Sequence, residues 1–303
     1  MAVKIDLAEI RKFGNIEMLA KQLVEGFITG LHKSPYHGFS VEFAEHRLYN
    51  SGESTRHIDW KVYGKTDKLF TKRYEEETNL RCQILIDISS SMYYPASNNG
   101  KVTFSIFAAA CLAYLLQTQR DAIGITTFGE DIELQSQVKS TPGHIHTLFL
   151  LLENLLKQAP IEKKTSVASV IHKIADKMNK RSLVVIFSDM FESEDDSTAL
   201  FQSLQHLKHN KHEVLLFHVT DSATEADFNF DDRPYEFIDI ENGEKVKVQP
   251  SEVREFYKES YQKKIHELSE KCAQYKIDFI PSDINKGFDQ VLSAYLIKRS
   301  RMK

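Results

Sequence analysis

This 303-residue chain is short of cysteine and has little net charge. Its three cysteines, Cys82, Cys111 and Cys272, are odd in number and form no C-x-x-C pair, which excludes a disulfide framework and a zinc motif of paired cysteines. We interpret them as buried free thiols of a reducing compartment. The net charge of −4 is small for this length, so the sequence implies no general attraction to nucleic acid or to a membrane surface.

The sequence also lacks the signals of several other protein classes. Charged residues interrupt the start of the chain, so no secretory signal peptide is predicted. The apolar stretch at 104–116 is shorter than the roughly 18 residues that a membrane-spanning helix needs, and it is typical of a buried core helix. No Gly-rich phosphate loop and no G-x-S-x-G serine motif is present. We therefore expect a cytoplasmic protein with no integral membrane segment.

From residue 81 onward, apolar runs typical of strands alternate with segments of helical periodicity. Strands are predicted near 82–88, 122–128, 132–135, 182–188, 213–219 and 277–280, and helices near 101–119, 142–157, 166–179, 197–209, 251–274 and 286–299. The short link at 129–131 makes the two strands beside it pair antiparallel. This alternation predicts an α/β fold with a doubly wound, mostly parallel sheet and one antiparallel edge strand.

Two segments stand outside this alternation. Apolar residues at threes and fours predict a helix over 1–33, and short runs punctuated by glycine predict strands near 39–48 and 68–77 with a turn-rich link between them. The acidic segment 222–249 predicts a hairpin around Asn242-Gly243. We therefore expect an N-terminal helix and β extension over 1–80, and an α/β domain over 81–300 with a hairpin insertion at about 222–249.

Three separated pieces of the chain place oxygen-bearing side chains where predicted strands end or helices begin. Loops at the carboxyl ends of strands in an open α/β sheet converge on one crevice. Two carboxylates and three hydroxyls there suit a hard cation such as Mg²⁺, with Mn²⁺ or Ca²⁺ as further possibilities. The sequence therefore predicts a metal site formed by Asp87, Ser89, Ser91, Thr165 and Asp189.

These motifs resemble the metal-ion-dependent adhesion site of von Willebrand factor A-type domains. The resemblance covers about residues 81–220, with 277–299 as a closing strand and helix. It implies that Ser89 and Ser91 bind the ion directly, and that Asp87, Thr165 and Asp189 bind it directly or through water. It also implies that a Glu or Asp of a partner protein completes the coordination.

The sequence departs from the pattern of A-type domains beside two of the expected ligands. Lys163-Lys164 stands before Thr165 where the family often has Gly-Gly, and Met190 follows Asp189 where it often has glycine. The lysines would either weaken cation binding by like-charge repulsion or point outward and attract an acidic partner. We expect Met190 and Phe191 to add an apolar rim to the docking face.

A second dense group of residues, Tyr49 to Trp60, precedes the α/β domain. In a structural interpretation, Trp60 anchors this segment and Arg56 pairs with Asp59 or a nearby carboxylate. In a functional interpretation, Arg56, Asp59 and Trp60 bind a partner or brace the metal loops.

The pattern from Arg47-x-Tyr49 to Ile58-Asp59-Trp60 resembles a bacterial family of unknown function. Members of that family carry an A-type domain and are typically encoded beside MoxR-type AAA+ ATPases. The resemblance extends over about residues 38–299. It implies a MoxR-type ATPase as the working partner of this protein.

The leading hypothesis is a non-enzymatic, metal-dependent protein–protein interaction module that docks a partner carboxylate. The resemblance implies an adaptor that works with a MoxR-type AAA+ ATPase in complex assembly or maturation. One alternative is a metal-dependent phosphoesterase, against which the serine-rich ligand set and the lack of an adjacent histidine argue. Another is a scaffold whose metal site stays empty.

Overall fold

The computed structural model of the chain describes residues 7, 10, 14–32, 46–48, 60–72, 80–96, 100–158, 167–178, 181–190, 197–239 and 243–302. It divides into two compact units, Met1–Gly30 with Leu80–Lys303 and Leu31–Asn79. Helix α2 (Ile16–His32) therefore lies largely in the larger unit, although the sequence grouped it with the β extension. The physical reason is that its apolar side chains, including Leu19, Leu23 and Val24, are buried.

The smaller unit contains a two-stranded antiparallel sheet and one short helix. Strand β1 (His46–Leu48) pairs with β2 (Phe70–Lys72), inside the two strand ranges that the sequence predicted. The link between them, predicted to be rich in turns, contains helix α3 (Trp60–Thr66). Trp60 begins α3, its side chain is 63% exposed, and its ring contacts Tyr63 edge to face at 6.1 Å.

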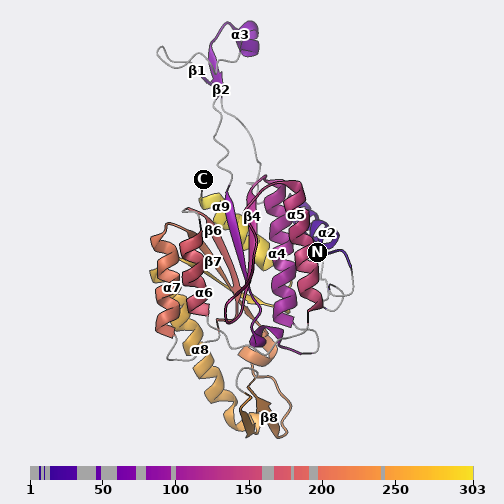
Figure 1. The fold of residues 1–303 in the computed structure, drawn as a ribbon, viewed down its shortest axis with the longest axis vertical. Coiled ribbons are helices and arrows are strands. Elements are labelled where there is room, and N and C mark those ends of the chain that lie inside the picture. The colour runs from indigo at the N-terminus through magenta and orange to yellow at the C-terminus, as the bar shows by residue number, and fades with distance from the viewer. Residues whose placement is uncertain are drawn as a thin grey trace. The chain divides into compact units, whose positions relative to one another are not determined.

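The larger unit is built on a six-stranded sheet of order β10-β7-β6-β3-β4-β5 (Figure 1). Its strands are β3 (Arg81–Asp87), β4 (Ala122–Phe128), β5 (Ile132–Gln135), β6 (Leu183–Ser188), β7 (Glu213–Thr220) and β10 (Asp278–Asp283). All neighbours pair in parallel except β4 and β5. Counted along the chain, this is the 3-2-1-4-5-6 order of a doubly wound sheet, with its third strand antiparallel at one edge. The predicted fold class is confirmed.

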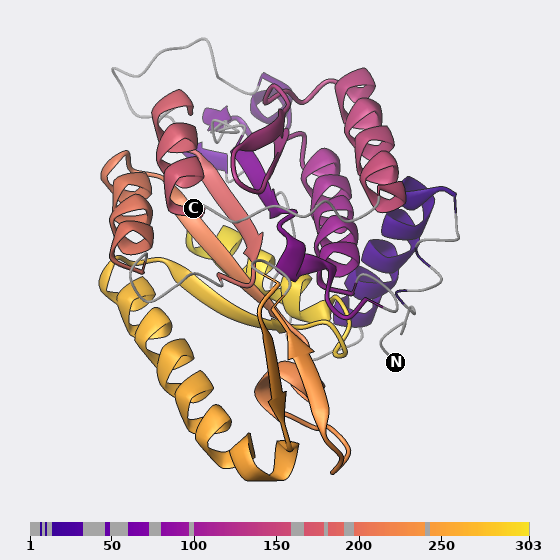
Figure 2. The same ribbon diagram turned by 60° about the horizontal axis from the view of Figure 1, so that its bottom comes forward.

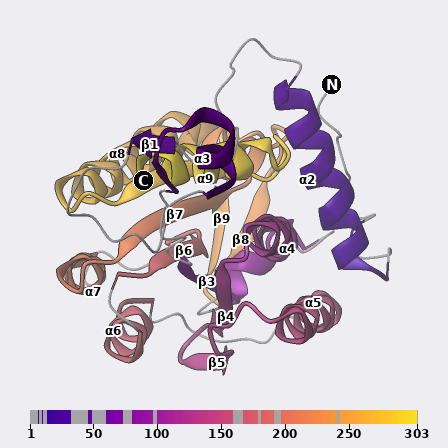
Figure 3. The same cartoon turned by 90° about the horizontal axis from the view of Figure 1, so that it is seen from above.

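Helices cover both faces of this sheet (Figure 3). They are α4 (Gly100–Thr118), α5 (Pro142–Lys157), α6 (Val167–Lys177), α7 (Ser197–His209), α8 (Pro250–Gln274) and α9 (Asp289–Arg301). Helices α6 and α7 enclose one apolar core with β3, β6 and β7, to which the end of α8 adds Leu268 and Cys272. Helices α4 and α9 pack together on the other face, where Phe104 stacks on Phe288. Both faces of the central strands are thus buried, which explains their continuous apolar sequences.

Helix α4 is apolar on all sides because it is enclosed on all sides. It is 19 residues long and lies within one residue of the predicted range 101–119 at each end, so it extends beyond the apolar stretch at 104–116. In the described part of the chain it is the one helix long and apolar enough to cross a membrane, and 89% of that stretch is buried inside the fold. A helix buried in the core of a large domain has this same composition.

The insertion after β7 consists of a short helix and a hairpin. Helix η3 (Ser222–Ala226) follows β7 directly, and β8 (Tyr235–Ile238) pairs antiparallel with β9 (Lys245–Val248). This confirms the predicted hairpin, although Asn242 of its predicted turn lies outside the described residues. Figure 2 shows the hairpin and the start of α8 extending from the sheet. Since η3 begins where β7 ends, the insertion leaves the sheet at the carboxyl ends of its parallel strands.

Candidate metal site

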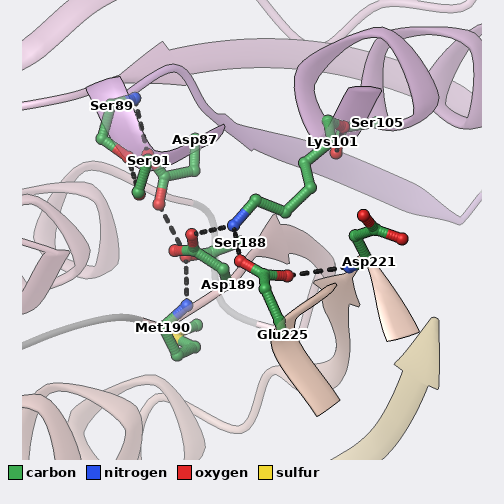
Figure 4. Close-up of polar contacts among 10 residues, drawn as sticks. All are labelled: Asp87, Ser89, Ser91, Lys101, Ser105, Ser188, Asp189, Met190, Asp221 and Glu225. Carbon is green, nitrogen blue, oxygen red and sulfur yellow. Dashed lines mark hydrogen bonds and ion pairs between the residues drawn. The ribbon is translucent and has the colours of Figure 1, made fainter. Parts of the chain in front are cut away.

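The candidate site lies at the carboxyl ends of β3 and β6, which are adjacent parallel strands. Asp87 ends β3 and Ser188 ends β6, each one residue beyond the paired Ile86 and Phe187. The chain then turns into helix η2 (Ser90–Tyr93) after β3, and Asp189 follows β6. The topology therefore brings the two aspartates, 102 positions apart in the numbering, to one place (Figure 4).

Asp87 is fully buried, and its carboxylate is held by hydrogen bonds from Ser188 and Ser89. Its Oδ2 accepts a hydrogen bond of 2.6 Å from the Ser188 hydroxyl, and its Oδ1 accepts one of 2.9 Å from the backbone N–H of Ser89. The Ser188 hydroxyl oxygen in turn accepts a hydrogen bond of 2.9 Å from the N–H of Met190. Ser188 thus orients the Asp87 carboxylate and links the two loops.

The hydroxyl groups of Ser89 and Ser91 lie side by side, with 3.2 Å between their oxygens. Ser89 occupies the capping position of η2, but its side chain makes no capping hydrogen bond. Its hydroxyl group instead contacts Ser91 and the Asp87 carboxylate. Ser91 also forms a hydrogen bond to the Asp189 carboxylate, so these hydroxyl groups link the two aspartates.

The oxygen atoms of these side chains fit a hard cation, for which the two carboxylates would be the charged ligands. Within the described part of the chain, no three side chains of His, Cys, Asp or Glu gather as metal ligands. Asp87, Ser89, Ser91 and Asp189 would hold the ion mainly through neutral hydroxyls and retained water, a set compatible with Mg²⁺. Four of the five predicted ligands are therefore brought together, and Thr165 lies outside the described residues.

Lys101 provides a positive charge inside this site. Its Nζ lies 2.8 Å from Asp189 Oδ2 and 2.6 Å from Glu225 Oε1 of η3, and its side chain is 2% exposed. The other Glu225 oxygen accepts a hydrogen bond of 2.7 Å from the N–H of Asp221. The ammonium group therefore joins the loop after β6 to the helix that opens the insertion (Figure 4).

Burial and neighbouring charges shift the pKa values of these groups in different directions. Burial and the nearby Asp189 raise the pKa of Asp87 to about 7. Burial alone would raise the pKa of Asp189, but the Lys101 ammonium outweighs it and leaves that pKa lowered. Burial raises the pKa of Glu225, with Lys101 opposing the shift. Asp189 is thus the carboxylate that Lys101 keeps ionised.

His218 on β7 also borders the site, which the sequence did not indicate. The residue is 4% exposed and its ring hydrogen-bonds to the backbone of Asp189. Burial lowers the pKa of His218 to about 4, so the imidazole is neutral at neutral pH. The expectation that no histidine lies near the metal loops is therefore wrong, but this histidine is enclosed and fixes the backbone after β6.

Met190 is buried, so the sequence-based expectation that it forms an exposed rim is wrong. Its side chain is 3% exposed and belongs to the apolar core beneath α6 and α7. Its backbone has φ of 48°, a left-handed conformation that costs a non-glycine residue roughly 1–2 kcal/mol. Met190 thus has the backbone conformation that favours glycine, the residue that A-type domains often have at this position. Its side chain nevertheless fills the core. Phe191, Arg56 and Asp59 lie outside the described residues.

Comparison with protein families gives one match that covers most of the chain. The model of the family described as "Protein of unknown function DUF58" matches residues 45–267. Curated relatives include two proteins named as uncharacterized, Rv1480 of Mycobacterium tuberculosis and Mb1516 of Mycobacterium bovis. Each is 24% identical over 174 residues, which is 57% of this chain and 55% of the relative. The chain thus spans about half the length of the curated relatives it matches.

The solved structures that this chain matches are distant from it in sequence. BatB from Bacteroides thetaiotaomicron, titled a conserved hypothetical protein, is 11% identical with a TM-score of 0.42, over 73% of this chain and 99% of that one. An aerotolerance-related membrane protein from Bacteroides fragilis is 14% identical with a TM-score of 0.41, over 72% and 99%. The PilB minor pilin of Streptococcus sanguinis is 7% identical with a TM-score of 0.40, over 77% and 64%. Because these TM-scores are low, we assign the fold from the strand order.

Proposed function

This chain belongs to the family described as protein of unknown function DUF58, and we propose that its α/β domain is a non-enzymatic, metal-dependent docking module. The ion would be Mg²⁺, with Mn²⁺ or Ca²⁺ as substitutes, held by Asp87, Ser89 and Ser91 with Asp189 and Thr165. A bound ion would supply an open coordination position for a carboxylate of a partner protein.

The observation that carries this proposal is the convergence of the Asp87 carboxylate with the Ser89 and Ser91 hydroxyls beside Asp189. Those two hydroxyl oxygens are 3.2 Å apart, and the Asp87 carboxylate is oriented by a hydrogen bond from the Ser188 hydroxyl. The carboxyl ends of the strands, where these side chains lie, are where open α/β sheets bind their ligands. The Ser89 and Ser91 hydroxyls are neutral, so the ion would keep more positive charge than it would with carboxylates in their place, which favours an acidic partner.

The resemblance to proteins encoded beside MoxR-type ATPases supports such an ATPase as the partner. In this proposal the protein is a cytoplasmic adaptor that presents the ATPase to a client during complex assembly or maturation. An acidic side chain of the ATPase or of the client would reach the ion.

A capture experiment with matched variants tests this function. Wild type, Asp87→Ala and Asp131→Ala would each be used to capture the MoxR-type ATPase of the source organism, with Mg²⁺ and with EDTA. Asp131 is a suitable control because it is an exposed aspartate that pairs with Lys173 on the surface. We expect capture by wild type and Asp131→Ala with Mg²⁺ only. Undiminished capture by folded Asp87→Ala, or in EDTA, would contradict the proposal.

A further inference from the structure

Lys101 lies where a lysine is unfavourable on two counts. It is the second residue of α4, and the amino end of a helix carries a partial positive charge that repels cations. Its side chain is also almost fully enclosed, and removing an ammonium group from water is costly unless it is paired. The two carboxylates that contact it, Asp189 and Glu225, offset both penalties.

This arrangement has a direct effect on the candidate ion site. The described site has two carboxylates, Asp87 and Asp189, and of these Asp189 is the one that contacts the lysine. A positive charge 2.8 Å from Asp189 Oδ2 already neutralises that carboxylate. A divalent cation would have to share Asp189 with the ammonium group, and like charges repel strongly in a poorly hydrated site. Lys101 therefore opposes the binding of any ion that uses Asp189 as a ligand.

We propose that Lys101 sets the ion affinity of this site as an internal counter-ion. It holds Asp189 and so weakens the binding of a divalent cation, which leaves Asp87, Ser89 and Ser91 as the main protein ligands. Through Glu225 the same ammonium group also ties the ion site to η3 and the insertion. This inference rests on the proposed function, because it concerns the same site.

Binding of Mn²⁺ to purified full-length protein tests the inference. Unbound Mn²⁺ can be counted from its electron paramagnetic resonance signal, which gives a dissociation constant without any activity assay. The variants are Lys101→Met and the double variant Lys101→Met/Glu225→Gln. The double variant keeps the net charge of the wild type, because it removes one positive and one negative charge. It also removes the unpaired Glu225 carboxylate that could prevent the single variant from folding.

Lys298→Met is the matched control. Lys298 also bridges two carboxylates, with Nζ 2.6 Å from Glu213 and 2.7 Å from Asp278, but these residues begin β7 and β10 at the opposite end of the sheet. We expect both Lys101 variants to bind Mn²⁺ at least about tenfold more tightly than wild type. We expect Lys298→Met to bind it as tightly as wild type does.

The outcomes separate the two proposals. If wild type and the Lys101 variants bind Mn²⁺ equally and Asp87→Asn does not bind it, the ion site stands and the role of Lys101 is overturned. If Lys298→Met tightens binding as much as the Lys101 variants do, only the overall charge matters and the inference is again overturned. If no protein binds Mn²⁺, the proposed function itself fails, and the inference fails with it.

Discussion

Replacing Lys101 with methionine should destabilise the fold by an amount that the structure allows us to bound. Methionine has a similar length and fills the same space, so the loss is mainly electrostatic. It leaves the Asp189 and Glu225 carboxylates, with side chains 6% and 24% exposed, without their shared cation. Removing one partner of a buried ion pair costs about 3–5 kcal/mol. The Ser91 hydrogen bond to Asp189 remains, so we expect a value near the lower limit, about 3 kcal/mol.

Urea unfolding at neutral pH, followed by circular dichroism in EDTA, measures this loss without any contribution from metal. The control is Lys298→Met, whose partners Glu213 and Asp278 are 41% and 37% exposed. Ion pairs of that exposure contribute about 1 kcal/mol or less. The double variant Lys101→Met/Glu225→Gln should recover about 1 kcal/mol or more relative to Lys101→Met, because it removes one of the uncompensated charges.

The comparison with Lys298→Met decides the outcome. A loss for Lys101→Met no larger than that for Lys298→Met would mean that Asp189 and Glu225 are well hydrated without the lysine. The pairing of Lys101 with Asp189 and Glu225 would then contribute little to the stability of the fold. If the double variant were no more stable than Lys101→Met, the Glu225 carboxylate would not depend on Lys101 for its stability.

Three further predictions concern side chains around the site. Met190→Ala should cost about 2–4 kcal/mol in urea unfolding, because it opens a cavity in the core beneath α6 and α7, and a near-neutral result would contradict the burial of Met190. Ser188→Ala should cost about 1–3 kcal/mol by the same assay, because Asp87 Oδ2 loses its donor and the Met190 N–H its acceptor. The pKa of Asp283 is lowered because hydrogen bonds from Ser222 and Asn285 outweigh the effect of burial. Its stabilising contribution is therefore present above its ordinary pKa and is lost as the pH falls. Asp283→Asn should then lose less stability than wild type between about pH 5 and 3, and parallel pH profiles would contradict this.

Most of the fold could be predicted from the sequence because its elements carry strong local signals. The central strands are continuous apolar runs, and the helix over Ser197–His209 was predicted with its observed bounds. Helix α3 was missed because its seven residues include Gly64 and are too few to establish a period. The grouping of α2 was missed because a helical pattern shows which face is buried and not what covers that face.

Only part of the candidate site could be predicted in the same way. Asp87, Ser89 and Ser91 lie within five consecutive residues, so their spacing was itself a signal. Lys101 contacts Asp189 across 88 positions and Glu225 across 124, and no pattern along the chain predicts such pairs. One local signal was present, since Lys101 is the only charged residue in the otherwise apolar and polar-neutral helix α4.

Two residues with locally unfavourable placements, Lys101 and Met190, lie beside Asp189. Lys101 places a charge at the unfavourable end of a buried helix, and Met190 takes a backbone conformation that favours glycine. Natural sequences tolerate such conflicts mainly where function requires them. Met190 fixes the backbone after β6 by filling the core, and Lys101 fixes the carboxylate charge. Together they hold Asp189 in one place and paired with the Lys101 ammonium group, so a divalent cation has to compete with that charge before it can use Asp189 as a ligand.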